Sequence, residues 1–208
     1  RRAQAAQADG AFAAEIAPVT VKTRKGEVVV DKDEEPARGN PAKVPTLGTA
    51  FQKDGTITAA NASKINDGAS AVVLMSADKA KALGLKPLAR LVATGSHAQA
   101  PEWFTTAPAG AMKKALDKAG LAVADISAFE INEAFAVVTL AVASELGLPM
   151  DRVNPRGGAV ALGHPIGASG NRIVVTMLHH LIQTGGRYGL AGICLGGGEA
   201  VAVLIERL

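Results

Sequence analysis

The chain has 208 residues, of which 48% are hydrophobic and 20% are charged, and its formal net charge is +3. This balance is typical of a folded globular protein and excludes a disordered one. No apolar run approaches the roughly 18 residues that span a bilayer, and the basic residues are scattered rather than interleaved with the single Trp and the single Tyr. We therefore expect no membrane partner and no nucleic-acid partner. The one cysteine excludes an intrachain disulfide and indicates a reducing compartment, which predicts a cytoplasmic protein.

The first 64 residues are polar and irregular. We expect a helix that ends at Gly10 and a short hairpin formed by residues 18–21 and 27–30. Residues 31–45 mix charges with three prolines, which predicts a surface loop.

From residue 65 onward, apolar runs alternate between the lengths typical of strands and of helices. Residues 69–75 predict a strand that has no partner within the chain, and Ser76 predicts the start of a helix. The remaining chain predicts an α/β fold with a mixed sheet. Its expected elements are a strand at 88–93, a helix from Pro108 to Gly120, a strand at 126–131, a helix ending at 146, a helix at 169–184 that buries Ile182 and leaves His179 and His180 on its surface, and an antiparallel pair at 189–194 and 200–206.

Three glycine- and alanine-rich motifs each contain one chemically capable residue. Asn132 opens the motif at residues 132–136, His164 lies within residues 157–167, and Cys194 precedes three consecutive glycines. Glycine permits positive φ and close approach of another backbone. An amide, an imidazole and a thiol on such turns indicate a reaction centre with exposed backbone N–H groups.

Each of these residues also has a purely structural interpretation. A lone cysteine at the end of an apolar strand is usually a small buried hydrophobe, a histidine in a turn is usually structural, and Asn132 between a strand and a helix fits an N-cap. The glycines after Cys194 favour a functional thiol because they admit a substrate carbonyl. From the residues alone, Cys194 would be a nucleophile, and a thioesterase that uses Cys194 and His164 is one alternative.

The motifs Asn-Glu-Ala-Phe-Ala at 132–136, Gly-Gly-Ala-Val-Ala-Leu-Gly-His-Pro at 157–165 and Cys-Leu-Gly-Gly-Gly at 194–198 together resemble the thiolase superfamily, and its acetyl-CoA acetyltransferases most closely. The resemblance implies an α/β, thiolase-like layered fold with a mixed sheet and helices. It makes residues 1–64 the remainder of a loop domain that covers coenzyme A, residues 65–86 the last strand and helix of the N-terminal thiolase domain, and residues 87–208 the C-terminal thiolase domain. Complete members are longer, so the chain resembles a C-terminal half.

The same resemblance implies a role for each candidate residue. Cys194 would act as the acid/base that takes the α-proton, while a cysteine outside this chain would carry the acyl group. His164 would activate that cysteine and, with a water held by Asn132, bind the thioester oxygen, and the Gly196 N–H would serve a second oxyanion hole. The residues that would contact coenzyme A are Ser63, Ala62, Ala59, Phe51, Ala134 and Phe135.

The implied reaction joins two acetyl-CoA molecules into acetoacetyl-CoA and CoA, or runs the reverse thiolysis. It needs no cofactor beyond the coenzyme A thioesters that are its substrates, and no metal. Complete chains would form a homodimer or homotetramer. Because one cysteine cannot fill both roles, we expect the isolated chain to be inactive. Alternatives are a broader-chain 3-ketoacyl-CoA thiolase of fatty-acid degradation, which the departures at Phe104 and Arg156 leave open, and a non-catalytic half that binds coenzyme A.

Overall fold

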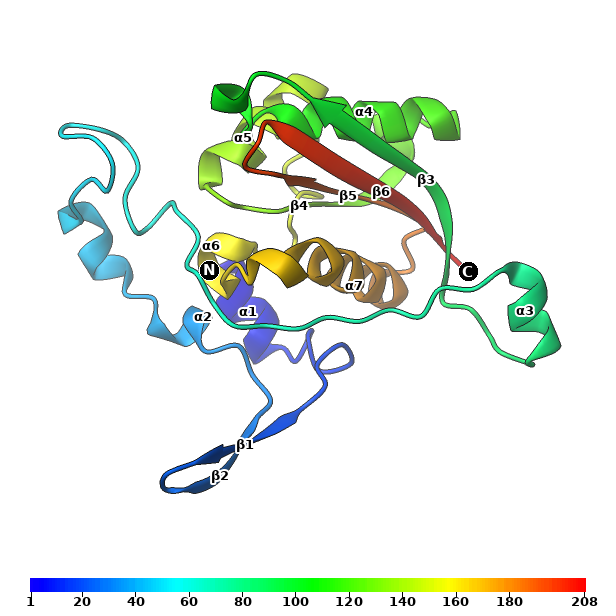
Figure 1. Ribbon diagram of the computed structural model, residues 1–208, viewed down its shortest axis with the longest axis horizontal. Coiled ribbons are helices and arrows are strands. Elements are labelled where there is room, and N and C mark those ends of the chain that lie inside the picture. The colour runs from blue at the N-terminus through cyan, green and yellow to red at the C-terminus, as the bar shows by residue number, and fades with distance from the viewer.

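The computed structural model describes all 208 residues and centres on a four-stranded mixed sheet in the order β3-β6-β5-β4 (Figure 1). β3 (Ala89–Ala98) pairs antiparallel with β6 (Glu199–Arg207), and β6 pairs antiparallel with β5 (Tyr188–Cys194). β5 then pairs in parallel with β4 (Ile126–Ile131). The α/β class, the mixed sheet and the antiparallel pair at the end of the chain are confirmed. β3 is longer than the strand expected at 88–93.

Helices cover both faces of this sheet. α4 (Ala107–Ala119) and α5 (Ala136–Leu146) lie on one face, and α7 (Ile166–Thr184) lies on the other (Figure 1). The core under α4 includes Met112, Leu116, Phe129 and Leu190, all buried. The core under α7 includes Ile173, Met177, Leu181, Ala128 and Ala191. The sheet is therefore buried on both sides, as the long apolar runs in its strands require.

The helix periodicities seen in the sequence are largely confirmed. α4 has Pro108 in its first turn, and Gly120 ends it in the left-handed conformation with φ +64°. α7 starts three residues before the expected position but ends where predicted. The prediction for Ile182 is wrong, because this side chain is 41% exposed. Residues 173, 177 and 181 follow a spacing of four, so they already fill the contact between α7 and the sheet, and residue 182 lies beside it.

Residues 1–64 lie outside this layered core. α1 (Arg2–Ala8) is followed by a hairpin of β1 (Val19–Thr23) and β2 (Gly26–Val30), which projects from the molecule in Figure 1. The helix before Gly10 and the hairpin are confirmed. The expected loop at 31–45 is partly wrong, because it contains the helical turn α2 (Glu35–Arg38), whose Glu35 is buried, and a 3₁₀ turn at Pro41–Thr46.

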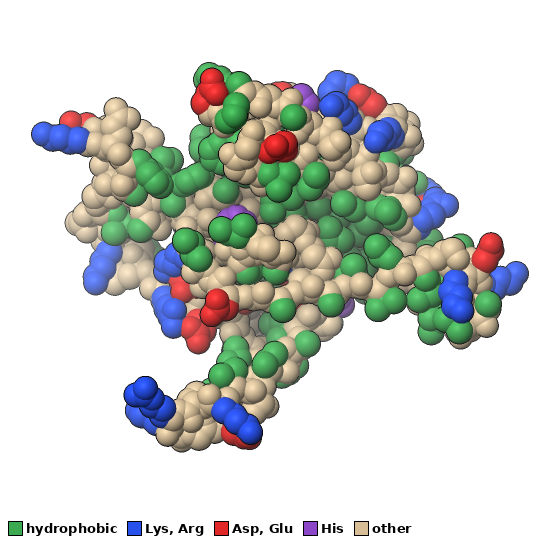
Figure 2. Space-filling view, viewed as in Figure 1, with side chains coloured by type: hydrophobic (Ala, Val, Ile, Leu, Met, Phe, Trp, Pro, Cys, Tyr) green, Lys and Arg blue, Asp and Glu red, His purple; other side chains and the backbone are tan.

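The predicted strand at residues 69–75 does not form. This segment is extended but belongs to no sheet, and it runs along α7 toward α3 (Ala77–Ala82), as Figure 1 shows. Ser70 accepts a hydrogen bond from Asn171 of α7 at 2.8 Å, while Val73 and Leu74 are 84% and 77% exposed. A strand needs a neighbour to pair its N–H and C=O groups, and no other strand of this chain reaches it. The apolar side chains along this segment are visible in Figure 2.

The short helices complete the arrangement. Ser76 caps α3 as predicted, accepting a hydrogen bond from the Lys79 N–H at 3.2 Å. α6 (Ala159–Leu162) is a single turn between α5 and α7, and further 3₁₀ turns occur at Pro101–Trp103 and Val123–Asp125. None of the helices combines the length and the apolar composition that a bilayer span requires.

Met177→Ala tests the packing of α7 on the sheet. Met177 is fully buried and lies directly over Gly189, where an added Cβ would approach its Cγ to 2.7 Å. We expect a loss of about 2–5 kcal/mol in the free energy of unfolding, because the truncation leaves a cavity. The matched control is Met150→Ala, since Met150 is 43% exposed. Urea denaturation of both variants measures this difference, and equal losses would contradict the proposed packing.

Candidate active site

The end of β4 brings Asn132 next to the end of β5. Ile131 pairs with Gly192 in the parallel register, and the Asn132 N–H donates to the Gly192 carbonyl at 3.0 Å. Cys194, the last residue of β5, follows two positions later. Because the carboxyl ends of parallel strands meet at the same edge of a sheet, the amide and the thiol belong to one edge.

His164 reaches this edge from the loop between α6 and α7. Its Nε2 lies 3.2 Å from the Asn132 Nδ2, and its Nδ1 lies 2.6 Å from the Ser169 Oγ. The Ser169 hydroxyl donates to the Pro165 carbonyl at 3.0 Å, so it accepts from the Nδ1–H of the ring. This assigns the neutral ring a proton on Nδ1 and an acceptor lone pair on Nε2, which takes the hydrogen bond from the Asn132 amide.

The local N-cap interpretation of Asn132 is wrong. The N-cap of α5 is Phe135, and Asn132 is fully buried with its amide directed at His164. The physical reason is that residues 133–135 form a bend before the helix begins, so the side chain that would have capped a helix faces the loop that carries His164.

The surroundings keep both titratable groups of this edge neutral. Burial, and after it the positive charge of Arg172, lowers the pKa of His164. Burial raises the pKa of the Cys194 thiol. At neutral pH the site therefore holds a neutral imidazole, whose Nε2 accepts the Asn132 hydrogen bond, and a protonated thiol, and each of these groups can exchange a proton.

Cys194 is half-buried and packs against the core under α4. Its side chain makes no hydrogen bond to His164 or Asn132, because the His164 Nε2 is engaged by the Asn132 amide. This arrangement does not favour the alternative in which Cys194 and His164 form a nucleophile–base pair, which needs a direct hydrogen bond between them.

The glycine loop after Cys194 leaves two backbone donors free. The N–H groups of Gly196 and Gly197 donate to no acceptor within the chain, whereas the Gly198 N–H donates to the Leu195 carbonyl at 3.2 Å. Gly198 has φ +96°, and an added Cβ would lie 2.4 Å from the Gln99 carbonyl oxygen, so only glycine fits there. The tight turn thus exposes the Gly196 N–H, the group that the sequence motif predicts to bind an oxyanion.

Glu133 and Asn154 hold the loops around the site. The Asn154 side chain accepts from the Ile131 N–H at 2.8 Å and donates to the Ile131 carbonyl at 2.9 Å, so it continues the edge of β4. The Glu133 carboxylate accepts from the Val160 N–H at 3.1 Å. An added Cβ at Gly158 would lie 2.3 Å from the Glu133 carboxyl carbon, so glycine is required for this approach. Glu133 therefore fixes the loop that leads to His164.

Five of the six residues predicted to contact coenzyme A lie together beside the start of α5. The Ser63 N–H donates to the Ala134 carbonyl at 3.0 Å, and Ala62 forms an antiparallel bridge with Phe135. The Phe51 ring meets the Phe135 ring edge-on with 6.0 Å between centroids. The sixth residue, Ala59, is exposed in the turn before Ala62. The Phe104 ring meets Phe135 in the same way at 6.5 Å.

Sequence reasoning missed the polar side chains behind the site. Glu130 precedes Asn132 by two residues on β4 and is 1% exposed, and neither of its carboxyl oxygens has a hydrogen-bond partner. Burial raises the pKa of Glu130 to about 8, and the charge of Arg172 opposes this increase. A glutamate inside the apolar strand at 126–131 was the available signal. Ser169, which orients His164, carried no comparable signal.

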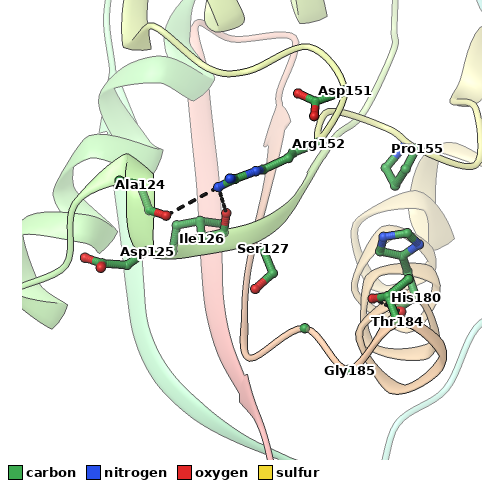
Figure 3. A pocket seen from close by; sticks show the side chains of 11 residues that line it. Ala124, Asp125, Ile126, Ser127, Asp151, Arg152, Pro155, His180, Thr184 and Gly185 are labelled. Carbon is green, nitrogen blue, oxygen red and sulfur yellow. Dashed lines mark hydrogen bonds between the residues drawn. The ribbon is translucent and has the colours of Figure 1, made fainter.

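A polar cavity lies elsewhere, at the other end of β4 and of α7. Its volume is about 530 Å³, and none of the predicted site residues lines it (Figure 3). Arg152 donates there to the carbonyl oxygens of Ala124 and Ile126 at 3.3 and 3.1 Å, while His180 and Thr184 face the cavity from α7. The prediction of a purely surface position for His180 is wrong, and so is that for His179, because both are half-buried and burial lowers the pKa of each. No group of three His, Cys, Asp or Glu side chains in the structure could hold a metal ion.

Two protein-family models match this chain. Residues 85–207 match the model of the thiolase C-terminal domain, and residues 1–78 match that of the thiolase N-terminal domain. The chain belongs to the thiolase family. It is 53% identical over 208 residues to an acetyl-CoA acetyltransferase of Yarrowia lipolytica, and the alignment covers all of this chain and 52% of that protein.

Solved thiolase structures share this fold. The chain superposes on the Bacillus anthracis acetyl-CoA acetyltransferase with a TM-score of 0.96 and 46% identity, and on human mitochondrial 3-ketoacyl-CoA thiolase with a TM-score of 0.92 and 39% identity. Each match covers all of this chain and 53% of the other. The chain therefore spans about half the length of the relatives it matches, and it has the layered thiolase fold.

Glu130→Gln tests the buried carboxyl. The folded pKa of Glu130, about 8, lies above its ordinary value of 4.5. Its contribution to stability is therefore fully present below pH 4.5 and is lost as the pH rises toward 8. We expect the variant to gain stability relative to the parent between pH 5 and pH 8, by up to about 1.4 kcal/mol per pH unit. Urea denaturation at the two pH values measures this gain. Glu27→Gln, at an exposed site on β2, is the control, and a gain that is independent of pH would contradict the prediction.

Proposed function

We propose that this chain supplies the acid/base half of a thiolase that joins two acetyl-CoA molecules into acetoacetyl-CoA and CoA, or runs the reverse thiolysis. The observation that carries the proposal is the 3.2 Å contact between Asn132 and His164 at the edge where β5 ends in Cys194. Family membership and the acetyl-CoA acetyltransferase relatives support the same reaction class.

The α-proton of the thioester goes to Cys194. When the acyl group passes to the cysteine outside this chain, the Cys194 thiol gives its proton to the departing CoA thiolate and becomes a thiolate itself. The sulfur then accepts the α-proton, and the electron pair of the C–H bond moves into an enolate whose oxygen becomes negative. Because burial raises the pKa of the thiol, the thiolate is a stronger base than an exposed one once it forms. The enolate still requires stabilisation at its oxygen, since a thiol is far more acidic than a thioester α-carbon.

The pair of Asn132 and His164 can provide this stabilisation. The His164 Nε2 carries no proton and accepts a 3.2 Å hydrogen bond from Asn132. When that bond is released, Nε2 can take the proton of the acyl-accepting thiol, which we place on a cysteine outside these 208 residues. Once protonated, Nε2–H becomes a donor, and together with a water on the Asn132 amide it holds the enolate oxygen. The enolate carbon then attacks the acyl thioester, and the free Gly196 N–H binds the oxyanion of the tetrahedral intermediate.

Coenzyme A would lie across the segment that pairs with the start of α5. Ala62 and Ser63 are bonded to residues 134 and 135, immediately after Asn132, so a ligand along this segment leads to the reacting edge. We propose contacts to coenzyme A from Phe51, Ala59, Ala62, Ser63, Ala134 and Phe135, without a further cofactor. We also propose that complete chains form a homodimer or homotetramer in the cytoplasm.

The isolated 208-residue chain is expected to be inactive in thiolysis of acetoacetyl-CoA, because its one cysteine cannot both carry the acyl group and exchange the α-proton. In a complete thiolase that contains these residues, Cys194→Ala should lower kcat by roughly 10²–10⁴-fold, the size of a general acid–base contribution. Chromatography of the CoA thioesters measures the thiolysis activity of the isolated chain and the kcat of the variant, and circular dichroism is the control for folding.

Three outcomes would contradict this assignment. Thiolysis by the isolated chain, shown by intact mass to be the 21.1 kDa species alone, would mean that no second cysteine is needed. Hydrolysis of acyl-CoA without consumption of CoA would support a thioesterase instead. Binding of CoA without turnover by the complete protein would indicate a non-catalytic half.

The acyl-chain preference is a separate question. The chain is 53% identical to an acetyl-CoA acetyltransferase and 39% identical to a 3-ketoacyl-CoA thiolase, which favours the short acyl group. Rates on acetoacetyl-CoA and on longer 3-ketoacyl-CoA substrates test this preference, and a higher kcat/KM for the longer chains would overturn it.

A further inference from the structure

We propose that Arg172 is a positioning residue for His164: its Nη1 and Nη2 atoms, buried without a hydrogen-bond partner one turn beyond Ser169 on α7, place a positive charge behind the ring that Ser169 and Asn132 hold. The use of the His164 ring in catalysis rests on the proposed function, but the effect of Arg172 on the ring does not.

One face of α7 carries polar side chains, and the first of them contacts His164. Ser169, Arg172 and Thr176 are spaced by three and four residues, so they lie on one face of the helix. Ser169 bonds the His164 ring, and Thr176 donates to the Glu15 carboxylate at 2.9 Å. Arg172 lies between these two anchored positions, which limits where its side chain can go.

The Arg172 guanidinium is unusual in its burial. Its Nη1 and Nη2 atoms are buried and have no hydrogen-bond partner, and the same holds for both carboxyl oxygens of Glu130 on the facing strand. A charge that is buried and not neutralised by a direct partner acts over a longer distance than an exposed one, because little solvent screens it. Arg172 therefore contributes a positive field to the space between α7 and β4.

Several other titratable groups lie around Arg172 and His164. From the N-terminal segment, Glu15 and Asp33 interact with the charge of Arg172, and burial raises the pKa of both carboxyl groups. On β4, burial raises the pKa of Glu130 to about 8, which favours its neutral form. In the loop after β4, the Glu133 carboxylate accepts hydrogen bonds from the Val160 N–H and the Asn154 amide. On the segment that pairs with His164, Lys64 is exposed and forms an ion pair with Glu35. From β5 the nearest titratable group is Cys194, whose thiol burial keeps protonated.

The hydrogen bonds of the ring agree with a neutral imidazole. Nδ1–H donates to Ser169, and Nε2 accepts from the Asn132 Nδ2. A proton on Nε2 would set two N–H groups against each other at 3.2 Å. The ring also precedes the N-terminus of α7, where the helix dipole disfavours a positive charge. Burial is the larger cause of the lowered pKa of His164, and the charge of Arg172 lowers this pKa further.

The test is the protonation of His164 in protein labelled with ¹⁵N in its histidine rings, followed by NMR as the pH is varied. Arg172→Met should increase the proton affinity of His164, because it removes the buried positive charge, and Arg172→Lys should restore most of the parent behaviour. His179 and His180 serve as internal controls, since the charge that acts on them is that of Arg156. Arg152→Met, at the far end of β4, is the matched control variant.

Activity gives the second readout. In a complete thiolase that contains these residues, Arg172→Met should shift the acidic limb of the kcat/KM profile to higher pH, because the neutral ring is then lost at a higher pH. A merely structural role would lower the rate equally at all pH values. An unchanged proton affinity of His164 in Arg172→Met, or an equal increase in Arg172→Lys, would overturn the inference. If Arg172→Met increases the proton affinity of His164 but the complete protein has no thiolase activity, the proposed function is contradicted and the inference about Arg172 is still supported.

Discussion

The parallel pairing of β4 with β5 is the constraint on which the candidate site depends. It aligns Ile131 with Gly192 and lets the Asn132 N–H bond the Gly192 carbonyl, so the two strands end at one edge with Asn132 and Cys194 on it. Parallel strands require a crossover connection, and α5, α6 and α7 supply it here. The same crossover contains His164, so the connection that the topology demands also carries the third chemical group.

Small residues allow this connection to lie close to the strands. The Glu133 carboxylate occupies space that a side chain at Gly158 would need, and the turn after Cys194 depends on the left-handed conformation of Gly198. These glycines reduce the stability of regular elements but let side-chain and backbone groups converge. Residues in the 157–167 and 194–198 motifs are therefore constrained by geometry as much as by chemistry.

Between β4 and α7 the core is not uniformly apolar. Arg156 and Glu15 form a buried ion pair at 3.3 Å, and Glu130 and Arg172 lie in the same layer without direct partners. Burying such groups opposes folding unless they are well compensated. Their position directly behind Asn132 and His164 suggests a physical link between the stability of this layer and the protonation of the site, since one set of charges acts on both.

Much of the fold could be predicted from the sequence, because it depends on local patterns. The stripe of residues 111, 112, 115 and 116 predicts α4, the apolar run at 126–131 predicts β4, and Gly120 predicts a helix end, since each reflects interactions between near neighbours in the chain. The motifs around Asn132, His164 and Cys194 were likewise visible, and so was the family they resemble.

Features that depend on distant residues are set by the packing of the folded chain. Residues 69–75 have the composition of a strand but no strand to pair with, so they stay outside the sheet. Asn132 has the sequence context of an N-cap but bonds His164, which is 32 residues away. Glu130, Ser169 and Arg172 come together only because α7 packs on β4, and no local pattern encodes that contact. Near-neighbour patterns thus predict most of the helices and strands and the chemical groups of the site, whereas long-range packing sets which groups meet and how they are charged.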